Sequence, residues 1–288
     1  MKLSNIFTFM LVAMIGVSPL FADDAATGAT AKAEAETAVK TEKKAAKKPA
    51  KKTAKKAAKK PAQKAAVRKL THEQEIKGAT TPVPNKHHFK RYAEKKAFAE
   101  ANKDKIKVLM LGDSITHLWE GKYAAAAQKK YLAPYGVLNL GCSGDRTQNT
   151  LWIIEKTGIL ELIKPQVVTI MIGTNNRDRY QATAAGVQRI VEEVRKRYPE
   201  VKILLYAIFP RGKDNSDARR IKNDKANEEI AKLCNGEDII WVDIRQKFLT
   251  PGGILEKKVM GDFLHPKTSK SYSIWGESLL PYFEKYAK

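Results

Sequence analysis

From residue 105 onward, short apolar runs alternate with longer stretches in which apolar residues recur every three or four positions. The apolar runs are rich in β-branched residues and predict strands at residues 106–111, 137–140, 167–172, 201–208 and 239–242. The stretches after them predict helices at residues 123–130, 147–156, 183–198, 218–233 and 271–285, and a polar helix at 85–101 precedes the first strand. Strands that alternate with helices predict an α/β fold, a parallel sheet covered on both faces by helices.

The first 22 residues follow a different pattern. Lys2 precedes an apolar run at residues 6–17, and a short segment ending in Ala22 follows it. A run of this length is too short to span a bilayer, and the order of its parts is typical of a signal peptide cleaved near Ala22. We therefore expect an exported protein, either periplasmic or secreted.

We interpret residues 23–81 as a disordered basic linker, because residues 23–70 are rich in Lys, Ala, Pro and Thr and have almost no large apolar side chains. Residues 23–70 carry 15 Lys and Arg against 5 Asp and Glu, so this segment supplies +10 of the formal net charge of +22. Neighbouring lysines repel one another, and Pro49 and Pro61 interrupt any helix. The segment has no aromatic residues among its lysines. Anionic polymers of the cell envelope are therefore its candidate partner, and we expect no specific nucleic acid.

The remaining residues, 82–288, are enough for one well-buried domain. Cys142 and Cys234 are the only cysteines, which is too few for a disulfide framework, so we expect free thiols. HExxH and CxxC motifs are missing, and the adjacent His87 and His88 are better explained as solvated or supporting residues than as metal ligands. We therefore predict no metal and no cofactor, and the oligomeric state stays open.

Four polar segments carry the candidate chemistry. They are residues 112–114 (GDS), 141–145 (GCSGD), 173–176 (GTNN) and 262–265 (DFLH), and the first three each follow a predicted strand. The carboxyl ends of parallel strands meet at the edge of the sheet where ligands bind. Ester hydrolysis needs a nucleophile, a base, a group that orients the base and donors for the oxyanion.

Ser114, His265 and Asp262 can supply the first three of these functions. Ser114 would attack the ester, His265 would accept its proton, and Asp262 would orient the imidazole from one helical turn, in which an i, i+3 pair shares a face. Taken singly, Gly-Asp-Ser is an ordinary turn sequence and Asp-x-x-His an ordinary start of a capped helix.

The order and the amino-acid sequences of the four segments resemble those of the SGNH/GDSL hydrolases. Within that family they look most like the catalytic subunits of intracellular platelet-activating factor acetylhydrolase and their bacterial relatives, over roughly residues 105–286. Residues 173–176, 210–212 (PRG) and 262–265 carry the closer likeness. The resemblance implies a three-layer α/β/α sandwich with a flavodoxin-like strand order, and it matches Ser114 to the nucleophilic serine.

The resemblance also implies an oxyanion hole formed by the backbone N–H groups of Ser114 and Gly144 and the side-chain amide of Asn175. Alone, Gly144 would suit a turn and Asn175 a helix cap, and it is their conjunction with the other segments that favours catalysis.

Five further residues near these segments have expected roles. We expect Asp113, Asp145 and Asn176 to hold the surrounding loops. His117 and Trp119 are candidates for lining an acyl pocket, with core packing as an equal alternative for Trp119.

Together these features predict a metal-independent serine esterase that removes a short acyl group, with acetyl expected, through an acyl-enzyme on Ser114. Its substrate would be a small ester or an acetylated polysaccharide, because export favours O-acetylated carbohydrate over the lipid-like ester implied by the relatives. An O-acyltransferase would use the same residues. A polyanion-binding protein that acts through residues 23–70 is the alternative from another class.

Overall fold

A five-stranded parallel sheet lies at the centre of the computed structural model, which describes residues 69–288. The strand order is β2-β1-β3-β4-β5, which confirms the predicted flavodoxin-like arrangement. The strands are β1 (Val108–Gly112), β2 (Val137–Asn139), β3 (Val167–Met171), β4 (Lys202–Tyr206) and β5 (Ile239–Val242). In the register, Leu109 of β1 pairs with Leu138 of β2 on one side and with Val168 of β3 on the other.

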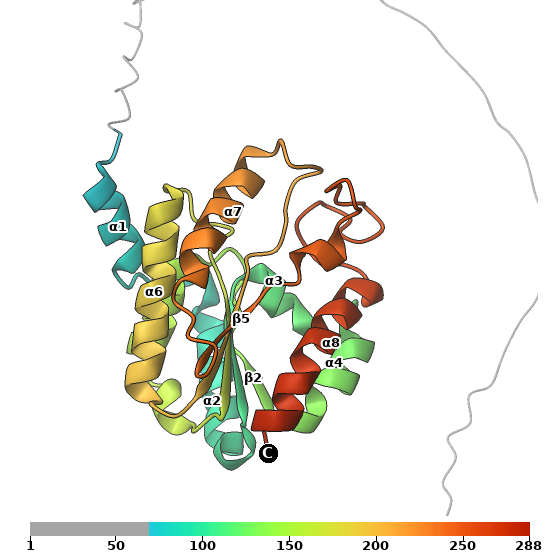
Figure 1. Cartoon of the computed structure of the whole chain (residues 1–288). Coiled ribbons are helices and arrows are strands. Elements are labelled where there is room, and N and C mark those ends of the chain that lie inside the picture. The colour runs from blue at the N-terminus through green and yellow to red at the C-terminus, as the bar shows by residue number, and fades with distance from the viewer. Residues whose placement is uncertain (1–68) are drawn as a thin grey trace, which may run out of the picture. The chain divides into compact units, whose positions relative to one another are not determined.

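Helices cover both faces of this sheet (Figure 1). They are α1 (His72–Thr80), α2 (Phe89–Asn102), α3 (Ser114–His117), α4 (Ala125–Tyr131), α5 (Thr147–Lys156), α6 (Tyr180–Arg197), α7 (Ala218–Ala231) and α8 (Ser269–Tyr286). Short 3₁₀ helices lie at Lys86–His88, Lys103–Lys105, Leu118–Glu120, Ala133–Tyr135, Leu160–Leu162 and Arg245–Phe248. Among residues 69–288, none of the helices combines the length and the apolar character that crossing a bilayer requires.

Each face of the sheet packs against its own hydrophobic cluster, so the central strands are buried on both sides. One cluster joins the strands to α5, α6 and α7, for example through Leu151 and Ile190. The other joins them to α4 and α8 through Tyr131 and Trp275. All five residues of β1 and of β3 are buried, which explains why these strands read as unbroken apolar runs instead of alternating ones.

The helix α1 corrects one predicted boundary, because it lies within the segment that we assigned to the linker through residue 81. Thr71 accepts a hydrogen bond from the backbone of Gln74, and the Gln74 side chain accepts one from the backbone of Thr71, which forms a capping box. Ala79 is fully buried, and its carbonyl accepts a 2.9 Å hydrogen bond from the Thr147 hydroxyl. The folded domain therefore includes α1. The predicted signal peptide and the linker as far as residue 68 lie outside the described residues.

Candidate active site

Ser114 lies where β1 turns sharply into α3. A Cβ atom on Gly112 would lie 2.1 Å from the hydroxyl of Thr116 and 2.7 Å from the carbonyl oxygen of Met171, so only glycine fits at this position. Asp113 caps α3 by accepting a 2.9 Å hydrogen bond from the backbone N–H of Ile115. The turn leaves Ser114 at the carboxyl edge of the sheet, 8% exposed.

The structure brings Ser114, His265 and Asp262 into one chain of hydrogen bonds. Ser114 Oγ lies 2.9 Å from Nε2 of His265, and Nδ1 of His265 lies 2.8 Å from Oδ2 of Asp262. Partial burial opposes ionisation of Asp262, but hydrogen bonds from His265 and Lys267 outweigh it and hold the pKa of this carboxyl well below its usual range. The ionised carboxylate can only accept, so Nδ1 of His265 carries the proton and Nε2 is free to accept from the Ser114 hydroxyl.

The segment that carries Asp262 and His265 is a tight turn, and the prediction of a helical turn is wrong. Phe263 has a φ of 55°, in the left-handed region that a bulky residue seldom adopts. The carboxylate of Asp262 stabilises the turn by accepting hydrogen bonds from the backbone N–H groups of Leu264 (3.2 Å) and His265 (2.8 Å). The N–H of Gly212 also donates to the Phe263 carbonyl at 2.9 Å. The side chains of Asp262 and His265 therefore meet because of a backbone turn. The i, i+3 spacing of a helix does not predict this turn.

The two other predicted oxyanion donors line one cavity of about 460 Å³. Gly144 is exposed and has a φ of 81°, which favours glycine. Asn175 follows β3, the sheet neighbour of β1, and its amide donates a 3.0 Å hydrogen bond to the backbone carbonyl of Asp145. A primary amide has two N–H donors, so Asn175 is anchored by one and can offer the other to a ligand.

Asp145 and Asn176 connect the loops around this cavity. Asp145 is buried and accepts a 2.8 Å hydrogen bond from the side chain of Asn85. Asn176 accepts from the backbone N–H of Thr147 at 3.1 Å and donates to its hydroxyl at 3.0 Å, which ties the loop after β3 to the start of α5. Burial raises the pKa of Asp113 to about 7, and burial raises that of Asp145 to about 7 as well.

His88 and His117 support the loop at residues 141–145. The sequence allowed a supporting role for His88 without identifying its partner, and it made His117 a candidate for lining an acyl pocket. His88 Nε2 lies 2.7 Å from the backbone carbonyl oxygen of Ser143, and His117 Nδ1 lies 3.0 Å from the Ser143 hydroxyl. Nε of Arg91 donates to the carbonyl of Gly141 at 2.9 Å. Burial, aided by the charge of Arg91, lowers the pKa of His117 to about 4. His117 therefore supports this loop as a neutral imidazole near neutral pH.

Trp119 belongs to the core and not to an acyl pocket. Its side chain is 1% exposed, and its ring centroid lies 4.7 Å from that of Tyr272 and 5.3 Å from that of Trp275. The alternative of core packing is therefore the correct one for this residue.

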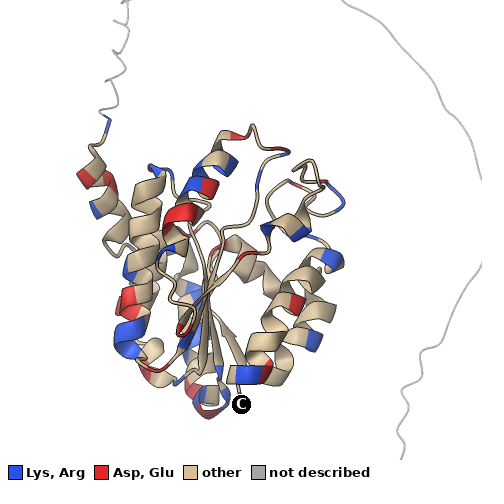
Figure 2. Cartoon of the chain, viewed as in Figure 1, with Lys and Arg blue, Asp and Glu red and all other residues tan. Residues whose placement is uncertain are grey.

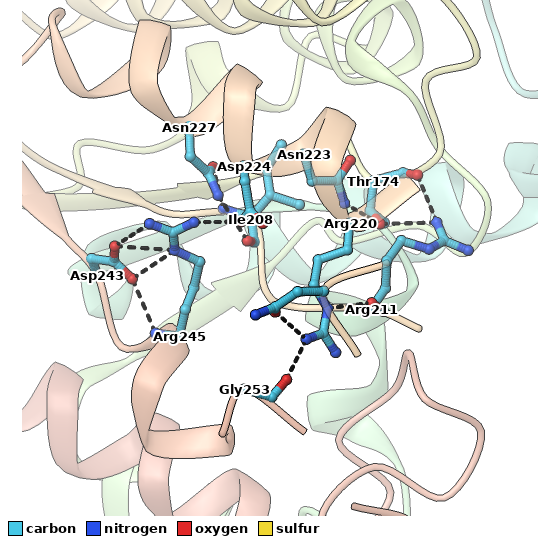
Figure 3. A network of polar contacts seen from close by, with 11 residues as sticks. Thr174, Ile208, Arg211, Arg220, Asn223, Asp224, Asn227, Asp243, Arg245 and Gly253 are labelled. Atoms are coloured by element: carbon cyan, nitrogen blue, oxygen red, sulfur yellow. Dashed lines mark hydrogen bonds and ion pairs between the residues drawn. The ribbon is translucent and has the colours of Figure 1, made fainter. Parts of the chain in front are cut away.

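Two arginines hold the loop after β4 in place beside the site (Figure 3). Arg211 donates to the carbonyl of Thr174 at 2.8 Å and to its hydroxyl at 3.0 Å. Arg220 is 2% exposed and donates to the carbonyls of Arg211 (2.7 Å), Gly212 (2.6 Å) and Gly253 (2.6 Å). These contacts fix the loop that carries Gly212, whose N–H holds the turn at Phe263. The PRG motif at residues 210–212 draws attention to Arg211, but no sequence pattern identifies Arg220 as a supporting residue.

Both cysteines are free, and neither is placed as a nucleophile. Burial raises the pKa of Cys142 to about 12 and that of Cys234 to about 11, so both thiols stay protonated near neutral pH. Within residues 69–288, no group of three or more His, Cys, Asp and Glu side chains is arranged to hold a metal ion.

Comparisons with known proteins identify similar sequences. Residues 110–269 match the sequence model of the GDSL-like Lipase/Acylhydrolase family. The chain is 34% identical over 163 residues to platelet-activating factor acetylhydrolase IB subunit alpha2 of Rattus norvegicus, covering 55% of this chain and 68% of the relative. It is 31% identical over 171 residues to subunit alpha1 of Homo sapiens, covering 58% and 72%.

Solved structures share the fold. A GDSL-like lipase from Bacteroides thetaiotaomicron superposes with a TM-score of 0.56 at 21% identity, covering 68% of this chain and 97% of the lipase. An acetyl xylan esterase superposes with a TM-score of 0.52 at 20% identity, covering 62% of this chain and 99% of the esterase. These two likenesses concern the arrangement of the backbone.

Proposed function

Because this chain belongs to the GDSL-like lipase/acylhydrolase family of carboxylic ester hydrolases, we propose that it is a serine esterase that removes acetyl or similarly short acyl groups. The observation that carries the proposal is the chain of hydrogen bonds from Ser114 through His265 to Asp262. Its parts have the order that acyl transfer requires: a hydroxyl, a neutral imidazole that can accept its proton, and a carboxylate that fixes the tautomer.

In the first half of the reaction, Ser114 Oγ attacks the ester carbonyl while its proton moves to Nε2 of His265. The negative charge that develops on the carbonyl oxygen is received by the N–H groups of Ser114 and Gly144 and by the amide of Asn175. The imidazolium of His265, stabilised by Asp262, then gives its proton to the leaving alcohol. The alcohol departs, and Ser114 carries the acyl group.

In the second half, His265 takes a proton from a water molecule that attacks the acyl-enzyme. The tetrahedral intermediate forms in the same oxyanion hole, and its collapse releases the carboxylic acid. Ser114 regains its proton from His265, which restores the starting state. The reaction needs only side chains and backbone groups of this chain, so we propose that it proceeds without a metal or a cofactor.

For the substrate, we propose an ester of a carbohydrate outside the cytoplasm. The pattern at residues 1–22 supports export to the periplasm or the medium, where acetylated polysaccharides are available. The acetylhydrolase relatives support acetyl as the acyl group by their name. We further propose that the basic segment at residues 23–70 associates with anionic polymers of the cell envelope.

The proposal is tested by measuring acetate released from acetylated xylan oligosaccharides and from platelet-activating factor, and 4-nitrophenol released from 4-nitrophenyl esters of increasing chain length. We expect turnover of acetyl esters to exceed that of octanoyl esters, and acetylated sugars to exceed the lipid. A sugar acceptor added to the same assay would reveal an acyltransferase if acetyl appeared on the acceptor and not as free acetate. Failure to cleave any of these esters would reject the esterase.

A further inference from the structure

The cavity that Gly144 and Asn175 line is also rich in positive charge. Five cationic side chains line it: Arg146, Arg177, Arg211, Arg219 and Lys222. We call this cavity the cationic pocket. Its charges come from the start of α5, the loop after β3 and the first turns of α7 with the loop before it, and Figure 2 shows Lys and Arg on α7 and on loops at that end of the domain.

In the part of the chain that the structure describes, the cations of the cationic pocket have no carboxylate in direct contact. Within residues 69–288, none of the five side chains forms an ion pair with Asp or Glu. Other arginines of the domain, such as Arg189 and Arg245, do pair with carboxylates. The nearby Asp217 caps α7 by accepting hydrogen bonds from the backbone N–H groups of Arg219 and Arg220.

The cations of the pocket act on one another. Burial lowers the pKa of Lys222, and although Asp178 opposes the shift, the charges of Arg211, Arg219 and Arg146 lower it further. Burial and the charge of Arg219 likewise lower the pKa of Arg211, although Asp217 and Asp113 oppose the shift. Like charges held together at a partly desolvated site produce a positive potential that a bound anion would relieve.

The cationic pocket adjoins the reacting groups. Gly144 and Asn175, which we propose as oxyanion donors, form part of its wall. The loop that carries Arg211 and Gly212 also holds the turn with Asp262 and His265, through the 2.9 Å hydrogen bond from Gly212 to Phe263. A group bound in the cationic pocket would therefore lie beside the scissile ester.

The side chains in the cationic pocket suit an oxyanion. Arg211 is held by Thr174 and presents a fixed guanidinium, whereas Arg177 and Arg219 are exposed and free to close on a ligand. Guanidinium groups bind carboxylates and phosphates through paired, charge-assisted hydrogen bonds. We propose that the cationic pocket binds a carboxylate or phosphate of the substrate, so that the preferred substrate is a short-chain ester carried on an anionic sugar. This inference rests on the proposed esterase function.

The test compares matched pairs of substrates that differ in one charge. One pair is O-acetylglucuronate and its neutral carboxamide, and the other is O-acetylglucose 6-phosphate and O-acetylglucose. We expect kcat/KM for acetate release from the anionic member of at least one pair to exceed that of its neutral partner about tenfold at low salt, which corresponds to about 1.4 kcal/mol. The pair with the larger ratio identifies the anion as carboxylate or phosphate, and high salt should reduce the ratio.

The double variant Arg177→Gln/Arg219→Gln should bring the ratio of kcat/KM between the anionic and the neutral substrate of a pair close to one. Lys122→Gln/Lys129→Gln removes the same charge from exposed positions at and before α4, on the other face of the sheet, and should leave the ratio unchanged. Arg177→Gln alone should lower the ratio in part, and it serves as the test if the double variant does not fold. A wild-type ratio near one for both pairs, or a ratio that the arginine variants do not change, would overturn the proposal.

The outcomes also separate this inference from the esterase function. Turnover of 4-nitrophenyl acetate without any preference for anionic sugars would reject anion binding in the cationic pocket and leave the proposed esterase function standing. If no ester, including 4-nitrophenyl acetate, is cleaved, both proposals fall.

Discussion

Ser114 Oγ lies 2.9 Å from Nε2 of His265, although 151 positions separate the two residues in the chain. The sheet places Ser114 at the end of a central strand, and α8 brings the preceding turn to the same edge, where the hydroxyl of Tyr272 approaches the carbonyl of Ile115 at 3.4 Å. The contact therefore depends on the whole fold. Removing the Ser114 hydroxyl is the most direct test of the mechanism.

Replacing Ser114 by alanine should abolish esterase activity, because among residues 69–288 no other hydroxyl forms a hydrogen bond with His265. We expect kcat on 4-nitrophenyl acetate to fall at least about 10³-fold, with thermal unfolding close to that of the wild type. Ser216→Ala is the matched control, since Ser216 is exposed and its hydroxyl donates to Asp214. Substantial turnover by a folded Ser114→Ala protein would contradict a covalent serine mechanism.

Replacing Asn175 by alanine should lower kcat much more than it raises KM. One N–H of its amide is engaged by the Asp145 carbonyl, and the other can stabilise charge that develops only in the transition state. Loss of one oxyanion donor typically costs about 10²–10³ in kcat. Steady-state kinetics over a range of ester concentrations provides the measurement, and an effect confined to KM would mean that Asn175 only binds the ground state.

The raised pKa of Asp113 predicts how stability depends on pH. In the folded chain this buried carboxyl titrates near pH 7, and its ordinary pKa is 3.8. The folded state therefore holds a proton that the unfolded state loses between about pH 4 and pH 7, so the stability that Asp113 contributes falls as pH rises through this window.

Asp113→Asn removes that titration. The free energy of unfolding of the variant, relative to wild type, should increase by about 2–4 kcal/mol between pH 4 and pH 7, since each pKa unit corresponds to about 1.4 kcal/mol. Urea unfolding at several pH values measures this difference. Asp104→Asn, at an exposed position, should show no such trend, and a parallel pH dependence for Asp113→Asn and wild type would contradict the prediction.

The sheet and most of the helices could be predicted because their patterns are local. Helix α5 and strand β5 have the predicted bounds, since continuous apolar or amphipathic patterns end there at clear polar residues. Helix α1 was not predicted, although Thr71 and Gln74 have the spacing of a capping box. The lysine-rich stretch before it dominates the composition of the segment that we assigned to the linker. Helix α3 is four residues long, too short for any periodic pattern.

The residues of the candidate site could be proposed from the sequence, but their geometry could not. Ser114, His265 and Asp262 could be selected by type and order, but the left-handed turn at Phe263 depends on contacts with a loop about 50 positions away, such as the hydrogen bond from Gly212. The contacts of His88 and His117 with Ser143, and that of Arg220 with Gly253, join distant parts of the chain, so the sequence does not show these partners.

Replacing Arg220 by methionine should destabilise the domain, because it would leave the carbonyls of Arg211, Gly212 and Gly253 without their donors. The contact with Arg211 is buried and the other two are partly buried. A buried polar group left unpaired costs about 1–3 kcal/mol, so we expect a loss of about 1–3 kcal/mol in the free energy of unfolding. The neighbouring Arg219→Met is the control, because Arg219 is exposed and its loss should change stability by no more than about 0.5 kcal/mol. Equal unfolding midpoints for the two variants would show that Arg220 does not hold this loop.

The basic segment at residues 23–70 should act as a tether and not as part of the catalyst. It holds +10 of the formal charge of the chain and none of the residues proposed for catalysis. Deleting residues 23–68 while keeping α1 should leave kcat and KM on a small neutral ester nearly unchanged. The same deletion should weaken salt-sensitive adsorption to anionic polymers, because lysines attract polyanions through charge that added salt screens. Turnover and adsorption of the full and shortened chains, measured at low and high salt, provide the comparison. Equal adsorption of the two chains would reduce the segment to a spacer, and a collapse of turnover would show that it contributes to the active domain.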